Sequence, residues 1–125
     1  MRSLRCLILL SIATVTGQVH AECDGSPDVI AACQQADAAD AELDKAYREL
    51  INQLESPPHG AEAHHAAAKK ALVDAQRTWV QFREKDCMAV FDIADGTSRN
   101  ALSVSCEADH DLARARQLRD MSNGL

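Results

Sequence analysis

Small and apolar residues recur every three or four positions along three stretches of the chain, and two breaks of helix-disfavouring residues separate these stretches. This spacing places them on one face of an α-helix, and no stretch alternates in the manner of a β-strand. The first helix is predicted to begin near residue 27 and to end before Pro57-Pro58, because proline cannot continue a helix. Its expected inner face consists of Ala36, Leu43, Tyr47, Leu50 and Leu54.

Two further helices are predicted after the proline break. The second extends from about residue 61 to about residue 93, and the third from about residue 99 to about residue 121. Between them, Gly96 suits a helix C-terminus and Ser98 suits an N-cap. The chain is therefore predicted to be all-α, a small antiparallel bundle of about three helices. The expected inner faces are Leu72, Ala75, Trp79, Phe82 and Val90 on the second helix, and Leu102, Cys106, Ala113 and Leu118 on the third.

The first 21 residues have the pattern of a secretory signal peptide. Arg2 and Arg5 precede an apolar run too short to span a bilayer, and Val19-His20-Ala21 is typical of a cleavage site. We expect residues 22–125 to form a single exported domain, periplasmic or secreted, with no membrane anchor. Loss of the signal would change the formal charge from −6 to −8, leaving 11 Lys and Arg against 19 Asp and Glu. Such an acidic domain repels nucleic acid and attracts cationic partners.

Four cysteines remain after the predicted cleavage, and an even number in an exported chain indicates two disulfides. Cys87 lies nine residues before Gly96 and Cys106 ten residues after it, so the two cysteines would sit at the same height on facing helices. This placement favours Cys87–Cys106, which leaves Cys23–Cys33. The rival pairing, Cys33–Cys87 with Cys23–Cys106, stays open at this point. The absence of a Cys-x-x-Cys pair disfavours a zinc site.

Three blocks of sequence together resemble a known family. They are residues 40–50 (DAELDKAYREL), residues 75–87 (AQRTWVQFREKDC), and Cys106 followed by Arg114 and Leu118. The chain resembles the lysozyme inhibitor LprI-type N-terminal domain family, formerly a bacterial domain of unknown function. The resemblance implies a helical exported protein that blocks lysozyme by protein–protein contact. The chain departs from the family in the turn at residues 95–98 and at His110-Asp111, where Leu-Thr is common, and we expect these departures to affect activity more than fold.

The residues that carry the resemblance are expected to stabilise the fold rather than to bind a ligand. Arg77 and Arg83 should pair with first-helix carboxylates such as Asp40 or Asp44 and should cover Trp79 with their aliphatic stems. The aromatic residues among them should belong to the core. The full set is Leu43, Tyr47, Leu50, Gln76, Arg77, Trp79, Phe82 and Arg83.

No arrangement typical of a catalytic site occurs in the sequence. The chain has no Gly-x-Ser-x-Gly turn and no phosphate-binding glycine loop, and its cysteines are expected to be oxidised. His64-His65 and Asp109-His110-Asp111 are runs of adjacent residues, whose side chains point about 100° apart on a helix, so they are expected to be solvated rather than to share a metal ion. We therefore predict a protein that is not an enzyme and has no cofactor and no metal.

Acidic residues gather around the predicted turn between the second and third helices. Their position suits the positive end of the third helix dipole, which is a purely structural explanation. The functional alternative is an anionic surface that docks against lysozyme or another cationic protein. An envelope interaction or scaffold domain with a non-lysozyme partner is the other reading. The candidate partner-binding residues are Asp92, Asp95, Glu107, Asp109 and Asp111.

Overall fold

The computed structural model describes Cys23 and residues 25–125, and the predicted signal peptide, residues 1–21, lies outside this part. The described chain forms three long helices, α1 (Pro27–Glu55), α2 (Glu62–Ile93) and α3 (Arg99–Asn123), with a short 3-10 helix, η1 (Gly96–Ser98), before α3. No strand occurs among these residues. The all-α prediction is confirmed, and each helix begins and ends close to its predicted boundary.

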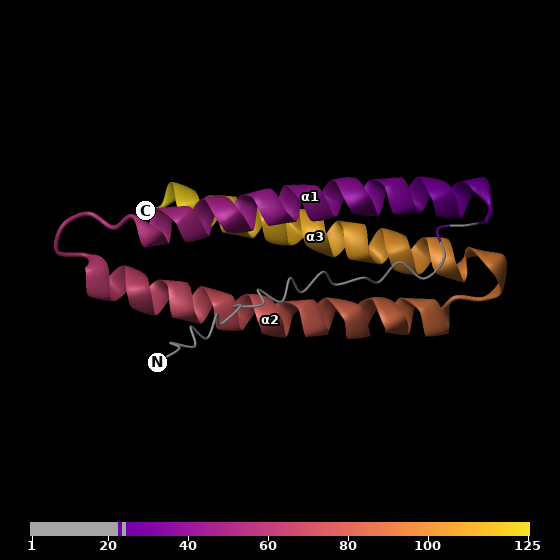
Figure 1. The fold of residues 1–125 in the computed structure, drawn as a ribbon. Coiled ribbons are helices and arrows are strands. Elements are labelled where there is room, and N and C mark those ends of the chain that lie inside the picture. The colour runs from indigo at the N-terminus through magenta and orange to yellow at the C-terminus, as the bar shows by residue number, and fades with distance from the viewer. Residues whose placement is uncertain (1–22, 24) are drawn as a thin grey trace, which may run out of the picture.

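Consecutive helices run in opposite directions along one elongated bundle (Figure 1). The α1–α2 loop lies at one end and the α2–α3 turn at the other, so α1 and α3 run the same way. In the turn, Gly96 has a φ of 73°, in the left-handed region that glycine adopts without strain. Ser98 stands at the N-cap position of α3, but its hydroxyl donates to the carbonyl of Asp95 at 3.4 Å and does not cap the helix.

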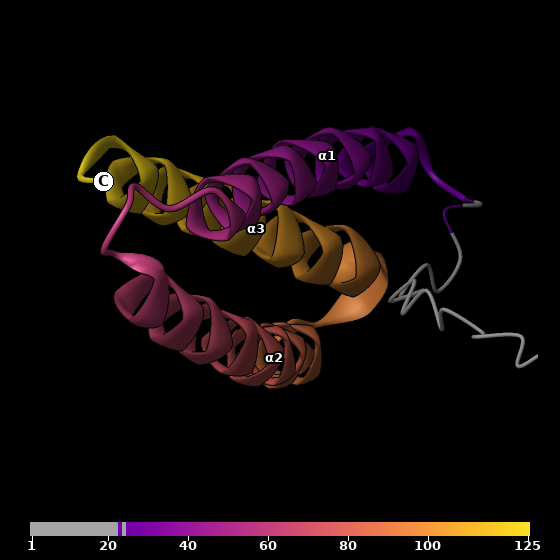
Figure 2. The same cartoon turned by 60° about the vertical axis from the view of Figure 1, so that its left-hand side comes forward.

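Small residues form much of the contact between α1 and α3, which pack together more extensively than either packs with α2 (Figure 2). Ala36 and Ala39 of α1 cluster with Ala108 of α3, and Ala46 clusters with Ala115. Because alanine side chains are short, the axes of the two helices can approach closely. Larger side chains fill the core toward the α1–α2 loop, namely Leu43, Leu50, Leu54, Leu72 and Leu118.

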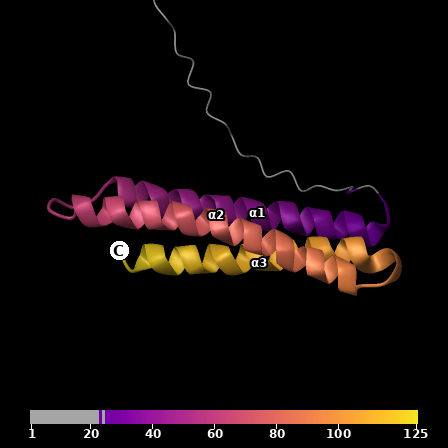
Figure 3. The same cartoon turned by 90° about the horizontal axis from the view of Figure 1, so that it is seen from below.

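The helix α2 buries much less of its surface than α1. Leu72 and Cys87 are its only buried residues, and Trp79 packs partly buried against the main core. Ala75 is exposed and Phe82 is 54% exposed, so the predicted inner face of α2 is wrong at these two positions. The helix runs obliquely to α3 (Figure 3), and an oblique crossing buries only part of the length of a helix.

The buried face of α3 also differs from the prediction. Leu118 is buried as expected, but Leu102 and Ala113 are exposed. Small residues differ little in hydrophobicity from their neighbours, and the buried position 111 holds a charged residue. Apolar spacing therefore placed the inner face of α3 incorrectly. The buried residues of α3 are Ala108, Asp111, Ala115 and Leu118.

Two disulfides tie neighbouring segments together. Cys87 of α2 is bonded to Cys106 of α3, with their Cα atoms 5.6 Å apart, and Cys23 is bonded to Cys33 of α1, with a Cα separation of 5.9 Å. This is the pairing that the spacing of the cysteines around Gly96 favoured. The first bond fixes α2 against α3 near their shared turn, and the second holds the segment before α1 against that helix.

Candidate functional site

Arg83 forms a nearly buried ion pair between α2 and α3. Its Nη1 donates to Asp111 Oδ1 at 2.6 Å, and the two side chains are 11% and 3% exposed. The guanidinium carbon lies 5.4 Å from the centre of the Trp79 ring, within range of a cation–π interaction. The prediction that Arg83 pairs with a carboxylate of the first helix is therefore wrong, because its partner lies on α3.

Asp111 was expected on an exposed acidic surface, and the structure corrects this as well. The residue is only 2% exposed. Burial raises the pKa of its carboxyl above the ordinary value of 3.8, and the nearby charge of Asp40 acts in the same direction, whereas the hydrogen bond and charge of Arg83 oppose the rise. Asp111 is thus a buried structural carboxylate and is not accessible to a partner protein.

A second motif residue of α2 also contacts α3. Arg114 Nε donates to Gln76 Oε1 at 3.0 Å, and its Nη1 donates to Gln117 Oε1 at 3.2 Å. Partial burial lowers the pKa of the Arg114 guanidinium. Gln76 and Arg83 are seven residues apart, so they lie on one face of α2, and both contacts join this face to α3. This part of the motif therefore fixes the packing of two helices.

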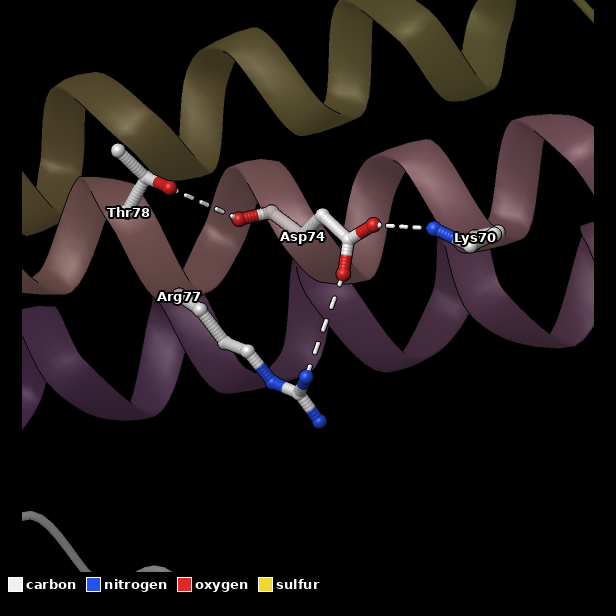
Figure 4. Close-up of polar contacts among 4 residues, drawn as sticks. All are labelled: Lys70, Asp74, Arg77 and Thr78. Carbon is white, nitrogen blue, oxygen red and sulfur yellow. Dashed lines mark hydrogen bonds and ion pairs between the residues drawn. The ribbon is translucent and has the colours of Figure 1, made fainter.

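Arg77 behaves differently from Arg83. It lies on the exposed side of α2, where its Nη1 is 4.0 Å from Asp74 Oδ1. Figure 4 shows Asp74 between Arg77 and Lys70, whose Nζ is 2.7 Å from Asp74 Oδ2, and Lys70 lowers the pKa of this carboxyl. The Thr78 hydroxyl donates to the Asp74 carbonyl at 3.2 Å. Arg77 thus belongs to an ion-pair network within α2 and does not pair with α1 as predicted.

The motif aromatic Phe82 lies outside the core. Its ring contacts His110 edge-on, with centroids 5.5 Å apart and an interplanar angle of 89°. His110 Nε2 lies 2.8 Å from Asp86 Oδ2, which adds a further polar contact between α3 and α2. In contrast, Tyr47 and Trp79 are partly buried against the main core, where Leu43 and Leu50 are buried.

One group of side chains has the spacing of a metal site. The sulfur atoms of Cys87 and Cys106 and a ring nitrogen of His110 lie within 4.8 Å of one another. Both sulfurs belong to a disulfide, however, and a disulfide sulfur does not act as the thiolate ligand that zinc requires. The group is therefore assigned to the packing of α2 on α3.

Four of the five candidate acids remain accessible to some degree, two of them beside the α2–α3 turn and two farther along α3. Asp92, Asp95 and Asp109 are exposed, and Glu107 is half-buried. Asp92 Oδ1 lies 3.8 Å from Arg99 Nη2, so one cation offsets part of its charge. We call Asp92, Asp95, Glu107 and Asp109 the acidic surface. They extend from the end of α2 across the turn onto α3.

A groove that the sequence pattern did not predict lies next to the acidic surface. It has a volume of about 330 Å³, at the small end of the range for ligand pockets. Its walls are one face of α2 and one face of α3, with residues spaced by three, four or seven positions. That spacing was visible in the sequence, but only the fold brings the two faces together. The groove is lined by Glu84, Met88, Phe91, Asn100, Ser103, Val104 and Glu107.

Comparison with known proteins places the chain in a family. It matches the model of the lysozyme inhibitor LprI family over residues 23–118. The chain belongs to this family. The matched region includes all four cysteines of the two disulfides and the α2 face that packs on α3. The family is named for an inhibitor, which agrees with the expectation that the protein is not an enzyme.

Two relatives extend the comparison. An uncharacterised protein of Rhizobium meliloti (strain 1021) is 32% identical over 96 residues, which cover 74% of this chain and 69% of the relative. The uncharacterised protein YecT of Escherichia coli (strain K12) is 30% identical over 110 residues, covering 81% of this chain and 67% of that protein. No solved structure matches the chain.

The disulfides and the family both indicate an extracytoplasmic protein. In the part of the chain that the structure describes, no helix is long and apolar enough to cross a membrane.

Proposed function

We propose that the protein is exported, is cleaved after Ala21, and acts as an acidic binding module that inhibits lysozyme by blocking its cleft. Membership of the lysozyme inhibitor LprI family supports this function. The observation that carries the proposal is the acidic surface, because Asp92 and Asp95 are exposed beside the α2–α3 turn and Asp109 is exposed farther along α3.

The position of the acidic surface suits steric inhibition. The turn lies at one end of an elongated bundle (Figure 1), so it can approach a concave surface without interference from the body of the domain. Lysozyme is strongly cationic, and opposite charges on the two proteins would steer them together and orient the turn toward basic residues near the cleft. Inhibition of this kind requires only that the cleft is covered, and no catalytic group is needed in the inhibitor.

Export and oxidation are tested first on protein produced in a bacterial host with its own N-terminus. We expect the intact mass to correspond to a chain that begins at Glu22 and lacks four hydrogen atoms, one pair for each disulfide. An intact mass that includes residues 1–21, or a mass heavier by the hydrogen atoms of free thiols, would contradict this part of the proposal.

Lysozyme inhibition is tested by measuring cell-wall hydrolysis with the oxidised protein in excess, at low and high salt. We expect inhibition to weaken with salt and to weaken in Asp95→Asn/Asp109→Asn. The matched control is Glu49→Gln/Asp120→Asn, which removes two exposed acids far along the chain from the turn and should inhibit like the wild type.

Two results would contradict the proposal in different ways. Equal loss of inhibition in both double variants would mean that net charge, and not the acidic surface, governs binding. No inhibition of any lysozyme class by folded, oxidised protein would reject the lysozyme function. That outcome would favour an envelope interaction domain with a non-lysozyme partner.

A further inference from the structure

We propose that the groove between α2 and α3 is a docking site for a partner segment in which a lysine or arginine side chain stands next to an apolar side chain. Only the identification of lysozyme as the partner rests on the proposed function. The preference for a cation beside an apolar group follows from the residues of the groove itself.

The middle of the groove is apolar and accessible. Met88 is 58% exposed, although it lies next in sequence to a fully buried cysteine, and Phe91 and Val104 are half-buried beside it. An unbranched methionine adapts its shape to different partners, which is typical of binding surfaces that receive apolar side chains. This part of the groove is therefore suited to an aliphatic or aromatic group.

Contacts between the two helices hold the walls of the groove in place. The Ser103 hydroxyl donates to the Cys87 carbonyl at 3.0 Å, next to the Cys87–Cys106 disulfide. Nearer the turn, Arg99 donates to the Phe91 carbonyl through Nε at 3.2 Å and Nη2 at 3.1 Å, and its guanidinium carbon lies 3.8 Å from the centre of the Phe91 ring. A groove fixed in this way loses little conformational entropy when a ligand binds.

The charged residues of the groove favour a cationic group in the ligand. Glu84 stands on the α2 wall and Glu107 on the α3 wall. Because Cys87 and Cys106 are bonded at one height, both glutamates lie at the end of the groove farther from the turn. A cation bound at this end would place its neighbouring apolar group over Met88. The chain carries a formal charge of −6, which disfavours phosphate and anionic lipid as ligands.

The experiment uses exported, oxidised protein labelled with ¹⁵N and the peptide acetyl-Ala-Arg-Leu-Phe-Ala-amide as a probe. We expect the peptide to shift the amide signals of Met88, Phe91 and Val104 in a saturable manner. The same peptide with glutamine in place of arginine should bind about fivefold more weakly, because it lacks the cation. Shifts that are absent, or that are centred on another face, would overturn the proposal.

Two variants test the two halves of the groove. Glu84→Gln/Glu107→Gln should remove the preference for arginine over glutamine, and Met88→Ser should weaken both peptides. The matched controls are Glu49→Gln/Asp120→Asn for charge and Ile30→Ser for an exposed apolar residue of α1, and both should bind like the wild type. Equal weakening in variants and controls would overturn the proposal. So would concentration-dependent shifts of the groove amides without peptide, which would assign the groove to a second copy of the chain.

Lysozyme binding is measured separately on the same variants. Loss of inhibition in Met88→Ser, but not in Ile30→Ser, would show that the groove contacts lysozyme. Normal inhibition by Met88→Ser and by the glutamine variant would overturn the groove as the lysozyme contact and leave the proposed function intact. If wild-type protein inhibits no lysozyme, the proposed function fails, and the peptide titration alone decides whether the groove binds a cation beside an apolar group.

Discussion

At the scale of single residues, Arg83 and Asp111 determine how α2 sits on α3. Both side chains are nearly buried, so neither charge is well solvated once its partner is removed. Arg83 Nε is also buried without a hydrogen-bond partner among the described residues, which increases the cost of placing this guanidinium in the interior. Removal of one partner should therefore be far more damaging than replacement of both.

We predict that Asp111→Ala lowers the free energy of unfolding by about 3–5 kcal/mol, because it leaves a buried, uncompensated charge on Arg83. The double variant Arg83→Met/Asp111→Leu should recover most of this loss, because two apolar side chains need no charge compensation. Urea denaturation followed by circular dichroism measures both changes. A loss below about 1 kcal/mol for Asp111→Ala would mean that water reaches the ion pair and that it is not buried in solution.

The titration of Asp111 provides a second test. Burial raises the pKa of this carboxyl above 3.8, so the folded protein binds its proton more tightly than the unfolded chain. The contribution of Asp111 to the free energy of unfolding should then decrease as the pH rises from the ordinary pKa of 3.8 through the raised pKa of the folded protein. We predict that the free energy of unfolding of the wild type, minus that of Asp111→Asn, is larger at about pH 3.5 than at about pH 6.

Urea denaturation over this pH range measures that difference, with Asp109→Asn as a control that removes an exposed neighbouring carboxylate. A difference that grows as the pH rises would show that the charge of Arg83 outweighs burial and that the pKa of Asp111 is lowered.

The sequence revealed which residues matter for the fold more readily than it revealed their partners. Arg83 was expected to pair within the bundle, and it does, but the partner lies on α3. Which carboxylate pairs with Arg83 depends on how α2 is rotated about its axis relative to α1 and α3. Apolar spacing does not determine this rotation. His110-Asp111, a departure from the family pattern, was expected to affect activity. Asp111 is buried in an ion pair with Arg83, so this departure contributes to the packing of α2 on α3, and its effect on activity stays a prediction.

At the scale of helices, the alanine contact between α1 and α3 sets the geometry of the bundle. Ala115 is fully buried in that contact, whereas Ala113, two positions earlier on the same helix, is exposed. We predict that Ala115→Leu lowers the free energy of unfolding by about 1–3 kcal/mol, because the larger side chain forces α1 and α3 apart.

Ala113→Leu is the matched control, since it makes the same chemical change on the outer face of the helix. Urea denaturation of the two variants should differ clearly. A larger loss of stability in Ala113→Leu than in Ala115→Leu would mean that the face predicted from apolar spacing is the buried one.

The helix α2 depends on its attachments more than on its own buried surface. It has two buried residues, and one of them, Cys87, is in the disulfide. We predict that Cys87→Ala/Cys106→Ala loses about 3 kcal/mol of stability and that amide exchange accelerates most in α2 and in the start of α3. Hydrogen exchange monitored by mass spectrometry resolves these segments.

Cys23→Ala/Cys33→Ala is the control for this experiment. That disulfide closes a loop with a sequence separation of 10, against 19 for Cys87–Cys106, and it joins Cys23 to the start of α1. Its removal should accelerate exchange there and leave α2 unchanged. Uniform acceleration throughout the chain in both variants would show that the bundle opens as one unit and that α2 is not separately labile.

Helix boundaries were predictable because proline, glycine and the turn residues act locally. The break at Pro57-Pro58 and the left-handed Gly96 are properties of a few adjacent residues, and both occur where expected. The inner faces of α2 and α3 were only partly predictable. Where alanine forms the contact, buried and exposed positions have the same composition, as Ala115 and Ala113 illustrate, and only tertiary packing distinguishes them.

At the scale of the whole molecule, the leucine core and the proposed binding surfaces lie toward opposite ends of the bundle. Most of the leucine core lies toward the α1–α2 loop, where Glu55 of α1 also pairs with Lys69 of α2. The groove and the acidic surface lie toward the α2–α3 turn, where the buried side chains of α1 and α3 are mostly small and the Cys87–Cys106 disulfide joins α2 to α3. Changes at the turn should therefore alter binding with little effect on global stability.

The proposed function leads to a prediction about the kinetics of lysozyme binding. Long-range attraction acts before contact, and the Debye length falls from about 30 Å at 0.01 M salt to about 8 Å at 0.15 M. We predict that the association rate constant decreases at least about tenfold over this range, while the dissociation rate constant changes much less. Surface plasmon resonance with immobilised lysozyme measures both constants.

The control variants distinguish the effect of the electrostatic field of the whole molecule on binding from the effect of direct contacts at the turn. Glu49→Gln/Asp120→Asn and Asp95→Asn/Asp109→Asn remove the same formal charge, so both should reduce the salt dependence of association through the total field. The turn variant should do so more strongly, and it alone should accelerate dissociation, because only its carboxylates are expected at the interface. If salt instead acts mainly on dissociation, steering is negligible, and the affinity must come from short-range contacts such as those in the groove.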